Sequence, residues 1–215
     1  MSDRKQSVPE EIANTITHGL GIVFCMIATP FLILLSAKGN AAGTWAVSVF
    51  SFGMLMVYLS STLYHAARNE TTKRTLRIWD HISIFLLIAG SYTPIVYRYT
   101  DSATSTLFLS IMWGLVALGV VKKLFLTGRY DKLSLILYLA MGWMAVFIIN
   151  PLIANMPASI FMYVITAGIF YSIGVVFYLL KRLQYHHAVW HVFVLAGTVT
   201  HFFAVYNSIP INIKV

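Results

Sequence analysis

The chain has 215 residues, of which 59% are hydrophobic and only 10% are charged. Soluble domains carry about 25% charged residues, so this composition excludes an ordinary soluble protein and predicts one embedded in a membrane. The formal net charge is +8, but the basic residues are scattered between apolar runs, so we do not expect a nucleic-acid groove. The single cysteine, Cys25, lies in an apolar run, where we expect it to pack against other helices; one cysteine excludes an intramolecular disulfide.

Seven apolar runs approach the length of about 20 residues that crosses a bilayer. The sequence therefore predicts an all-α bundle of seven transmembrane helices at Ile16–Ser36, Ala42–Tyr64, Asp80–Tyr97, Ala103–Val121, Leu133–Ile149, Ala158–Leu180 and Val189–Tyr206. Residues 1–15 are polar, and we expect them to form a short cytoplasmic segment at the surface, followed by the membrane domain over residues 16–215. The first run has no clear small-residue cleavage site after it, which favours a retained helix over a signal peptide.

The distribution of Lys and Arg predicts the orientation of these spans. If successive runs cross the membrane, 12 of the 15 basic residues fall on one side and 3 on the other. The positive-inside rule then places the N-terminus in the cytoplasm and the C-terminus outside the cell membrane. This orientation is the reverse of that of G-protein-coupled receptors. A retinal protein is also excluded, because Val189–Tyr206 contains no lysine.

In this topology, ionisable residues from three separate runs share one depth near the cytoplasmic face. His65 ends the second span, Asp80 begins the third, and His187 and His191 lie at the start of the seventh. A spacing of four residues places His187 and His191 on one helix face, as two ligands of one metal require. With His65 as the third ligand, one tetrahedral position of Zn²⁺ stays open, as in catalytic sites. Asp80, the only carboxylate inside a predicted span, could orient a water there and take its proton.

Each of these residues also has a simpler interpretation. A His–x3–His pair at a helix start is often interfacial, His65 could contact headgroups or water, and Asp80 could be the N-cap of the third helix. Three further histidines are assigned to the membrane interface: His18, His81 and His186. The convergence of His65, Asp80 and the histidine pair at one face favours the metal site, because polar residues within spans are costly and usually functional.

Two polar features lie deeper in the predicted bundle. His201 is ten residues past His191, about 15 Å along the helix axis, so it cannot share an ion with His191. We favour a core histidine hydrogen-bonded to a neighbouring helix over the alternative, the wall of a water-filled cavity. The run Gly90-Ser91-Tyr92-Thr93-Pro94 is expected to break the outer half of the third helix, because Pro94 lacks a backbone donor. It would form either a helix end or a polar cavity wall.

The motifs at these positions resemble a known family. They are Ser61-Thr62-Leu63-Tyr64-His65, Asp80 followed by Gly90-Ser91-Tyr92-Thr93-Pro94, and His187-Ala188-Val189-Trp190-His191. With Glu11-Ile12-Ala13-Asn14 and Thr17-His18-Gly19, they resemble the bacterial hemolysin III family. That family belongs with the progestin and adipoQ receptors and, more distantly, with alkaline ceramidases. The resemblance covers nearly the whole chain.

The resemblance implies a fold, a site and an activity. It implies seven helices with the N-terminus inside, and Zn²⁺ held near the cytoplasmic face by His65, His187 and His191. It also implies that Asp80 contacts the zinc through water and that Ser61 supports the site one turn from His65, so both are candidate catalytic residues. The expected activity is hydrolysis of lipid amides or esters in membrane homeostasis, with membrane lipids as partners.

Two other functions are considered: a membrane-state sensor with structural zinc, and a cytolysin. The cytolysin is physically the weakest, because we find no secretion signal or amphipathic pore-forming segment. The chain also lacks the long N-terminal domain of the eukaryotic receptors, so adiponectin-like recognition is not expected. The sequence sets neither the substrate nor the oligomeric state.

Overall fold

The computed structural model describes residues 6–127 and 131–210, and its elements there are all helical. They are α1 (Val8–Ser36), α2 (Ala41–Ala66), α3 (Glu70–Tyr99), α4 (Ser102–Leu126), α5 (Asp131–Gly142), the 3₁₀ helix η1 (Met144–Ile148), α6 (Ile149–Asn155), α7 (Ala158–Leu179) and α8 (His186–Ser208). Within this part of the chain, seven helical stretches are long and apolar enough to cross a membrane, the fifth being Lys132–Asn155. The predicted all-α fold with seven spans is confirmed.

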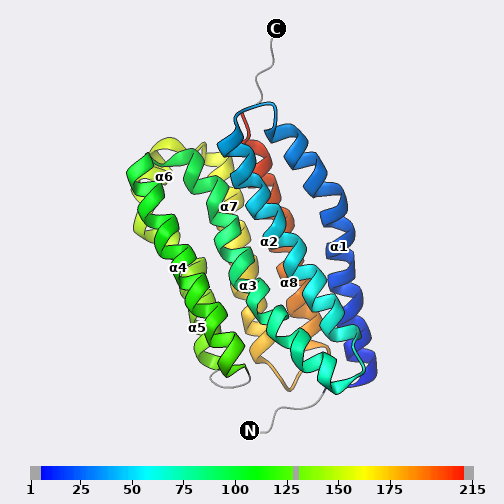
Figure 1. Cartoon of the computed structure of the whole chain (residues 1–215). Helices are drawn as coiled ribbons and strands as arrows, with labels where there is room; N and C mark the ends of the chain where they lie inside the picture. Colours follow the sequence, from blue (N-terminus) through cyan, green and yellow to red (C-terminus); the bar gives the residue numbers. More distant parts are fainter. Residues whose placement is uncertain (1–5, 128–130, 211–215) are drawn as a thin grey trace.

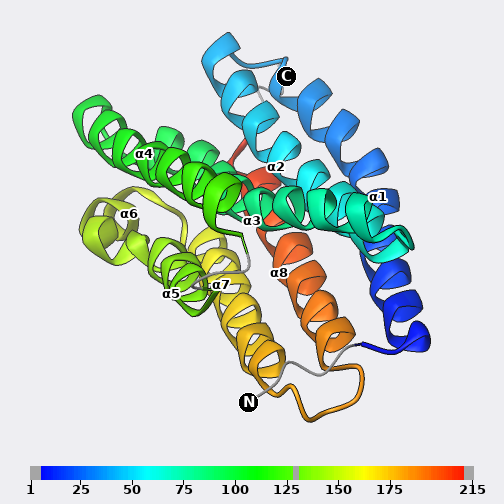
Figure 2. The ribbon, with the colours of Figure 1, turned by 60° about the horizontal axis from the view of Figure 1, so that its bottom comes forward.

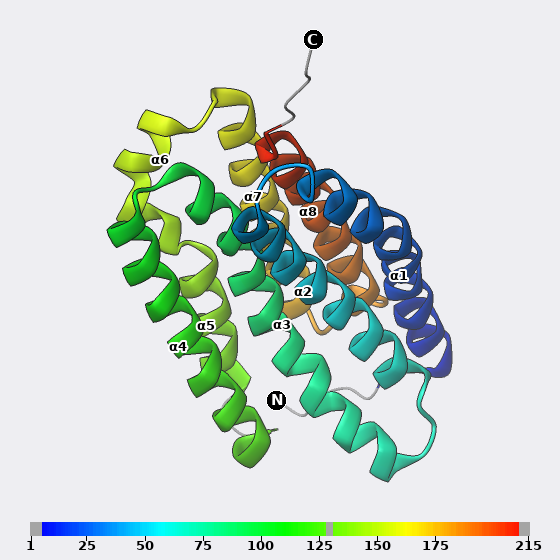
Figure 3. The same cartoon turned by 45° about the horizontal axis from the view of Figure 1, so that its top comes forward.

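The long helices run side by side, alternately up and down (Figure 1). Helices α1, α3 and α8 begin at the lower end in that view, where α2 and α7 end, and α8 finishes at the opposite end. Seen from below, α8 lies between α7 and α1 (Figure 2), and it also contacts α3. The view from above shows α4, α5 and α6 together on one flank and α1 on the other (Figure 3). The lower end therefore brings residues from distant parts of the sequence together.

Glycines allow α2 and α3 to pack with their backbones in close contact. A Cβ atom on Gly53 would lie 2.8 Å from the carbonyl oxygen of Leu86, and one on Gly90 would lie 3.1 Å from that of Val49. Small residues at such positions let membrane helices approach closely, which is a main source of their association in lipid. The pairing of α2 with α3 fixes His65 relative to Asp80.

Helix α1 begins at Val8, eight residues before the predicted start of the first span. The backbone N–H of Ser7 donates to Oε2 of Glu10 at 2.9 Å, which is half of a capping box and stabilises a helix start in polar sequence. Glu10 and Asn14 are buried, at 3% and 0% exposure. The expectation that residues 1–15 lie at the surface is therefore wrong for these two side chains.

Helix α3 differs from the predicted third span, Asp80–Tyr97, at its start and in its outer half. It begins at Glu70 with Asn69 as its N-cap, whose side chain accepts from the N–H of Thr72, so Asp80 lies in the helix interior and is not a cap. The helix also continues through Pro94 to Tyr99, so α3 does not have the break that was predicted in its outer half. Residues Glu70–Asp80, at the start of α3, are mostly polar, so a search for apolar runs placed the start of the helix too late.

The irregular segment lies instead in the fifth span, which was predicted as one helix over Leu133–Ile149. Helix α5 ends at Gly142, and the chain passes through the 3₁₀ helix η1 before α6. Tyr92 of α3 supports this change, because its hydroxyl donates to the carbonyl of Gly142 at 2.6 Å and accepts from the N–H of Ala145 at 3.1 Å. Non-helical backbone within a membrane requires such partners.

Candidate metal centre

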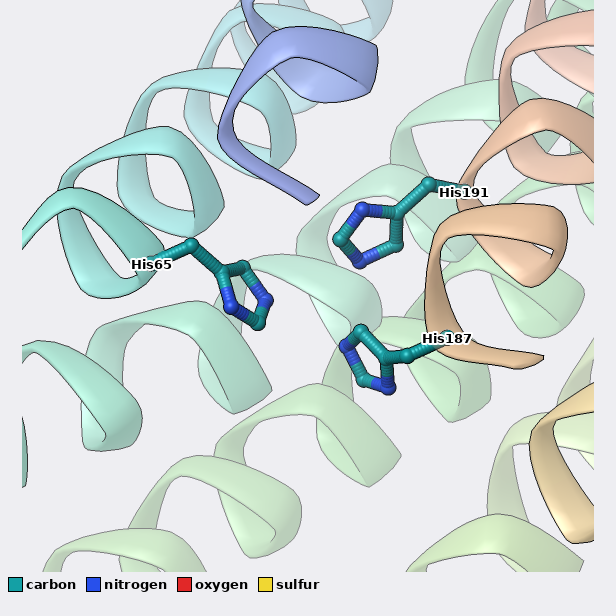
Figure 4. A group of neighbouring side chains, drawn as sticks. All are labelled: His65, His187 and His191. Atoms are coloured by element: carbon teal, nitrogen blue, oxygen red, sulfur yellow. The ribbon is translucent and has the colours of Figure 1, made fainter. Parts of the chain in front are cut away.

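Three histidines from two helices meet at the lower end of the bundle. His65 is the next-to-last residue of α2, and His187 and His191 lie on the first two turns of α8. The ring centroids are 5.0 Å apart for His65 and His187, 5.1 Å for His65 and His191, and 4.5 Å for the α8 pair. One ligand nitrogen of each ring lies within 4.8 Å of those of the others. Figure 4 shows the three rings turned towards a common space.

The hydrogen bonds of these rings determine which nitrogens remain available. Nδ1 of His65 lies 2.6 Å from Oε2 of Glu11, and Nδ1 of His191 lies 3.2 Å from Oγ1 of Thr17. Among the described residues, Nε2 of each of the three histidines is buried and has no hydrogen-bond partner. Because buried polar atoms are normally satisfied, three orphaned nitrogens at one point fit the donor set of a metal ion.

The spacing is close to what an ion requires. Nitrogens bound tetrahedrally to zinc at about 2.0–2.1 Å would lie about 3.4 Å apart, so small rotations of the rings from their present separation would complete the set. The group of His65, His187 and His191 could thus hold a metal ion, as the sequence predicted.

A cavity of about 1300 Å³ adjoins two of the three histidines. Asp80, His65 and His187 line one part of it, and it extends past His201 along apolar side chains that include Ile88, Leu139, Val164 and Val194. Typical small-ligand pockets have volumes of about 300–1,000 Å³. The cavity therefore has room for a long molecule with an apolar chain, and its lining also carries basic side chains, among them Lys73, Arg77 and Lys123.

Asp80 and Ser61 lie in different positions relative to this cavity. Asp80 is 6% exposed and lines the cavity, but it is not part of the donor group within 4.8 Å. That placement is compatible with a water molecule between its carboxylate and an ion. Ser61 is buried one turn before His65 and is not among the described residues that line the cavity. Its predicted catalytic role, like that of Asp80, stays a prediction.

The other histidines differ from expectation in part. His18 and His186, assigned to the interface, are buried at 1% and 8% exposure, and the ring of His18 lies 3.6 Å from that of His191, centroid to centroid. Those two assignments are wrong, because both helices begin with polar turns that pack inside the bundle. Nε2 of His201 lies 3.0 Å from the carbonyl oxygen of Ser91 and donates to it, which confirms a core histidine bonded to a neighbouring helix. The same side chain lines the cavity.

Sequence reasoning missed two groups of residues around the site. On α1, Glu11 and Thr17 contact the histidines, and the buried positions Glu10, Asn14 and His18 recur every four residues. A polar stripe with helical spacing was the available signal. Lys123 lies beyond the predicted fourth span, Ala103–Val121, but it is a 2% exposed residue of α4 that lines the cavity, with Nζ 3.1 Å from Nδ1 of His81. An apolar-run search could not find it, because lysine ends such runs.

Comparison with known proteins decides the family. Residues 6–202 match the model of the family described as "Haemolysin-III related". The chain belongs to this haemolysin-III-related family. Its sequence is similar to "Hemolysin-3 homolog" of Bacillus subtilis (strain 168), with 40% identity over 93% of this chain and 94% of that protein. It is also similar to "Hemolysin-3" of Bacillus cereus, with 38% identity over 95% and 94% of the two chains.

This haemolysin-III-related chain is also similar, at lower identity, to animal proteins. The human "Monocyte to macrophage differentiation factor" is 23% identical over 94% of this chain and 86% of that protein. The resemblance to the hemolysin III family is therefore confirmed, and the chain is a multi-pass membrane protein of that family.

Proposed function

We propose that this haemolysin-III-related protein is a zinc-dependent intramembrane hydrolase that cleaves lipid amides or esters. One observation carries the proposal: within the described part of the chain, Nε2 of His65, of His187 and of His191 is buried without a hydrogen-bond partner, and the three rings face one space (Figure 4) beside a cavity of about 1300 Å³ that Asp80 also lines. Three imidazoles hold zinc with one position left open, which is the ligand set of catalytic zinc. When bound, zinc would polarise an acyl carbonyl and make water acidic enough to act at neutral pH.

The residues of the chain then supply the remaining chemistry. Asp80 would hold the attacking water by a hydrogen bond and accept its proton as the water oxygen bonds to the acyl carbon. The same proton would pass to the leaving nitrogen or oxygen as its bond to the acyl carbon breaks, which yields a carboxylic acid and an amine or alcohol. The apolar part of the cavity would hold the acyl chain, and the membrane would supply the lipid.

The proposal includes a location and orientation. The basic residues favour a cytoplasmic N-terminus and an external C-terminus in the cell membrane, with the zinc site near the cytoplasmic face. The reaction would then act on lipids that enter from the inner leaflet. A role in membrane homeostasis follows, because cleavage would change the composition of that leaflet.

The test uses purified protein in lipid nanodiscs, incubated with a panel of bacterial lipid amides and esters and assayed for released fatty acid by mass spectrometry. We expect release with zinc, loss of release after chelation, and recovery on adding zinc back. A variant with His187→Ala and His191→Ala is the matched control and should release none. Zinc retention without turnover of any lipid would overturn the hydrolase and favour structural zinc in a membrane-state sensor. Lysis of red cells by the purified protein would favour the cytolysin that the relatives' name suggests.

A further inference from the structure

Glu11 of α1 lies between a proposed metal ligand and a lysine from a third helix. Its Oε2 is 2.6 Å from Nδ1 of His65 on α2, and its Oε1 accepts from Nζ of Lys73 on α3 at 2.7 Å. The side chain of Glu11 is 24% exposed, and that of His65 is 2% exposed. Each carboxylate oxygen of Glu11 therefore has its own partner, and Glu11 is the middle member of a chain of three side chains whose buried end is His65.

This contact fixes the proton on the His65 ring. A carboxylate accepts hydrogen bonds and does not donate them, so the bond requires a proton on Nδ1 and leaves the lone pair on Nε2. Nε2 is the atom that has no partner among the described residues. Asn14 offers only a weaker contact, because its Nδ2 lies 3.4 Å from Nδ1 of His65 and is itself a donor to Gln6. Glu11 thus selects the tautomer that can bind a metal through Nε2.

We propose that Glu11 is the positioning residue of the metal site: its carboxylate fixes the tautomer and ring orientation of His65. The inference rests on the proposed zinc site and deepens it. A histidine ligand commonly donates its other N–H to a carboxylate, which orients the ring and increases its basicity. Lys73 compensates the charge of Glu11, which keeps the carboxylate ionised in a partly buried position.

The same helix also contacts the other ligand helix. Oε1 of Glu10 accepts from the backbone N–H of Tyr185, the N-cap of α8, at 3.0 Å. Oγ1 of Thr17 lies 3.2 Å from Nδ1 of His191. Helix α1 supplies none of the three proposed ligands. Its side chains nevertheless contact Nδ1 of His65 and Nδ1 of His191, and also the start of α8, the helix that carries His187 and His191. The first turns of α1 therefore hold the proposed ligands in place without binding the metal themselves.

The experiment measures zinc affinity by competition with a fluorescent chelator on purified, detergent-solubilised protein. Glu11→Gln keeps the size of the side chain and removes its charge, and we expect zinc affinity to fall about 10-fold, with Glu11→Ala nearer 100-fold, within the range for outer partners of metal ligands. Glu70→Gln is the matched control, because it removes the same charge from an exposed residue of the α3 first turn. It should change the affinity less than about 2-fold. Equal affinity of wild type and both Glu11 variants would overturn the inference.

Two further measurements separate positioning from a purely structural tie. Lys73→Gln also breaks the Glu11–Lys73 ion pair but leaves the carboxylate on His65, so we expect it to lose less affinity than Glu11→Gln. A structural tie alone predicts equal losses for the two variants and would overturn the positioning role. In protein loaded with Co²⁺, Glu11→Gln should shift the visible absorption of the metal, while Glu70→Gln should not.

These outcomes distinguish this inference from the proposed function. Zinc binding by wild type that weakens in Glu11→Gln, with no lipid turnover, would support the positioning role and overturn the hydrolase. Normal lipid turnover with unchanged zinc affinity in the Glu11 variants would support the hydrolase and overturn the positioning role. A wild-type protein that binds no zinc would overturn both. Thermal unfolding of the metal-free variants confirms that the affinities compare folded proteins.

Discussion

Replacement of Asp80 by Asn tests the proposed chemistry at one oxygen atom. Asp80 is 6% exposed, lies inside α3 and lines the cavity beside His65, so an isosteric side chain should keep the packing. Asn cannot take a proton at neutral pH. Loss of a general base costs about 10²–10⁴-fold in rate, which corresponds to about 3–5 kcal/mol of transition-state stabilisation. We therefore expect lipid hydrolysis to fall by that factor.

The same variant should keep most of its zinc, because Asp80 lies outside the group of three possible ligands. Loss of a residue that contacts the metal only through water typically lowers metal affinity about 10–100-fold. If the wild type binds zinc in the nanomolar range, the site of the variant would still be filled at micromolar zinc. Fatty-acid release and zinc content are measured on the same preparation. Unchanged turnover would refute the catalytic role. Complete loss of zinc from folded protein would show that Asp80 is a direct ligand. A helix cap no longer explains this residue, since α3 begins ten residues earlier.

Three further predictions concern the fold. Gly53→Ala should lower stability by about 1–3 kcal/mol in thermal unfolding, because the new Cβ would lie 2.8 Å from the carbonyl oxygen of Leu86, whereas Gly114→Ala has nothing within 4 Å and should not; equal melting temperatures would contradict the close packing of α2 and α3. Reporter fusions should be active in the cytoplasm at the N-terminus and outside at the C-terminus, and cytoplasmic signals at both ends would refute this orientation. Hydrogen bonds from Thr104 hold the pKa of Asp101, the N-cap of α4, below its ordinary value, so this carboxylate stabilises the fold above about pH 4 and the stabilisation is lost as pH falls further. Asp101→Ala should therefore lower the melting temperature at pH 7, and its difference from wild type should shrink as the solution is made more acidic than about pH 4. A difference that does not change with pH would contradict the assignment.

The sequence predicted the spans and the three histidines for clear physical reasons. A helix formed by a long apolar run can cross a bilayer because it satisfies its backbone hydrogen bonds internally. Alternate crossing then brings the end of α2 and the start of α8 to one side of the bundle. The i, i+4 spacing of His187 and His191 then needed only helical geometry. These predictions required no knowledge of side-chain packing.

The remaining features depend on tertiary contacts that leave a weak trace in the sequence. The starts of α1 and α3 are polar, so hydropathy placed the starts of these helices too late in the sequence. His18, near the polar start of α1, was assigned to the membrane interface although it is buried. The position of Glu11 between His65 and Lys73 depends on how α1 packs against α2 and α3. The interruption after Gly142 is stabilised by Tyr92, about fifty residues earlier in the chain, and no local pattern specifies that pairing.

The number of zinc ions per chain tests the central claim most directly. Wild-type protein, purified in the presence of zinc and freed of loosely bound metal, would be compared by elemental analysis with the variant carrying His187→Ala and His191→Ala. His201→Ala serves as the control, since His201 lies on the same helix outside the group of three histidines. We predict one zinc per chain in wild type and in the His201 variant, and none in the double variant. Full zinc in the folded double variant would contradict the account.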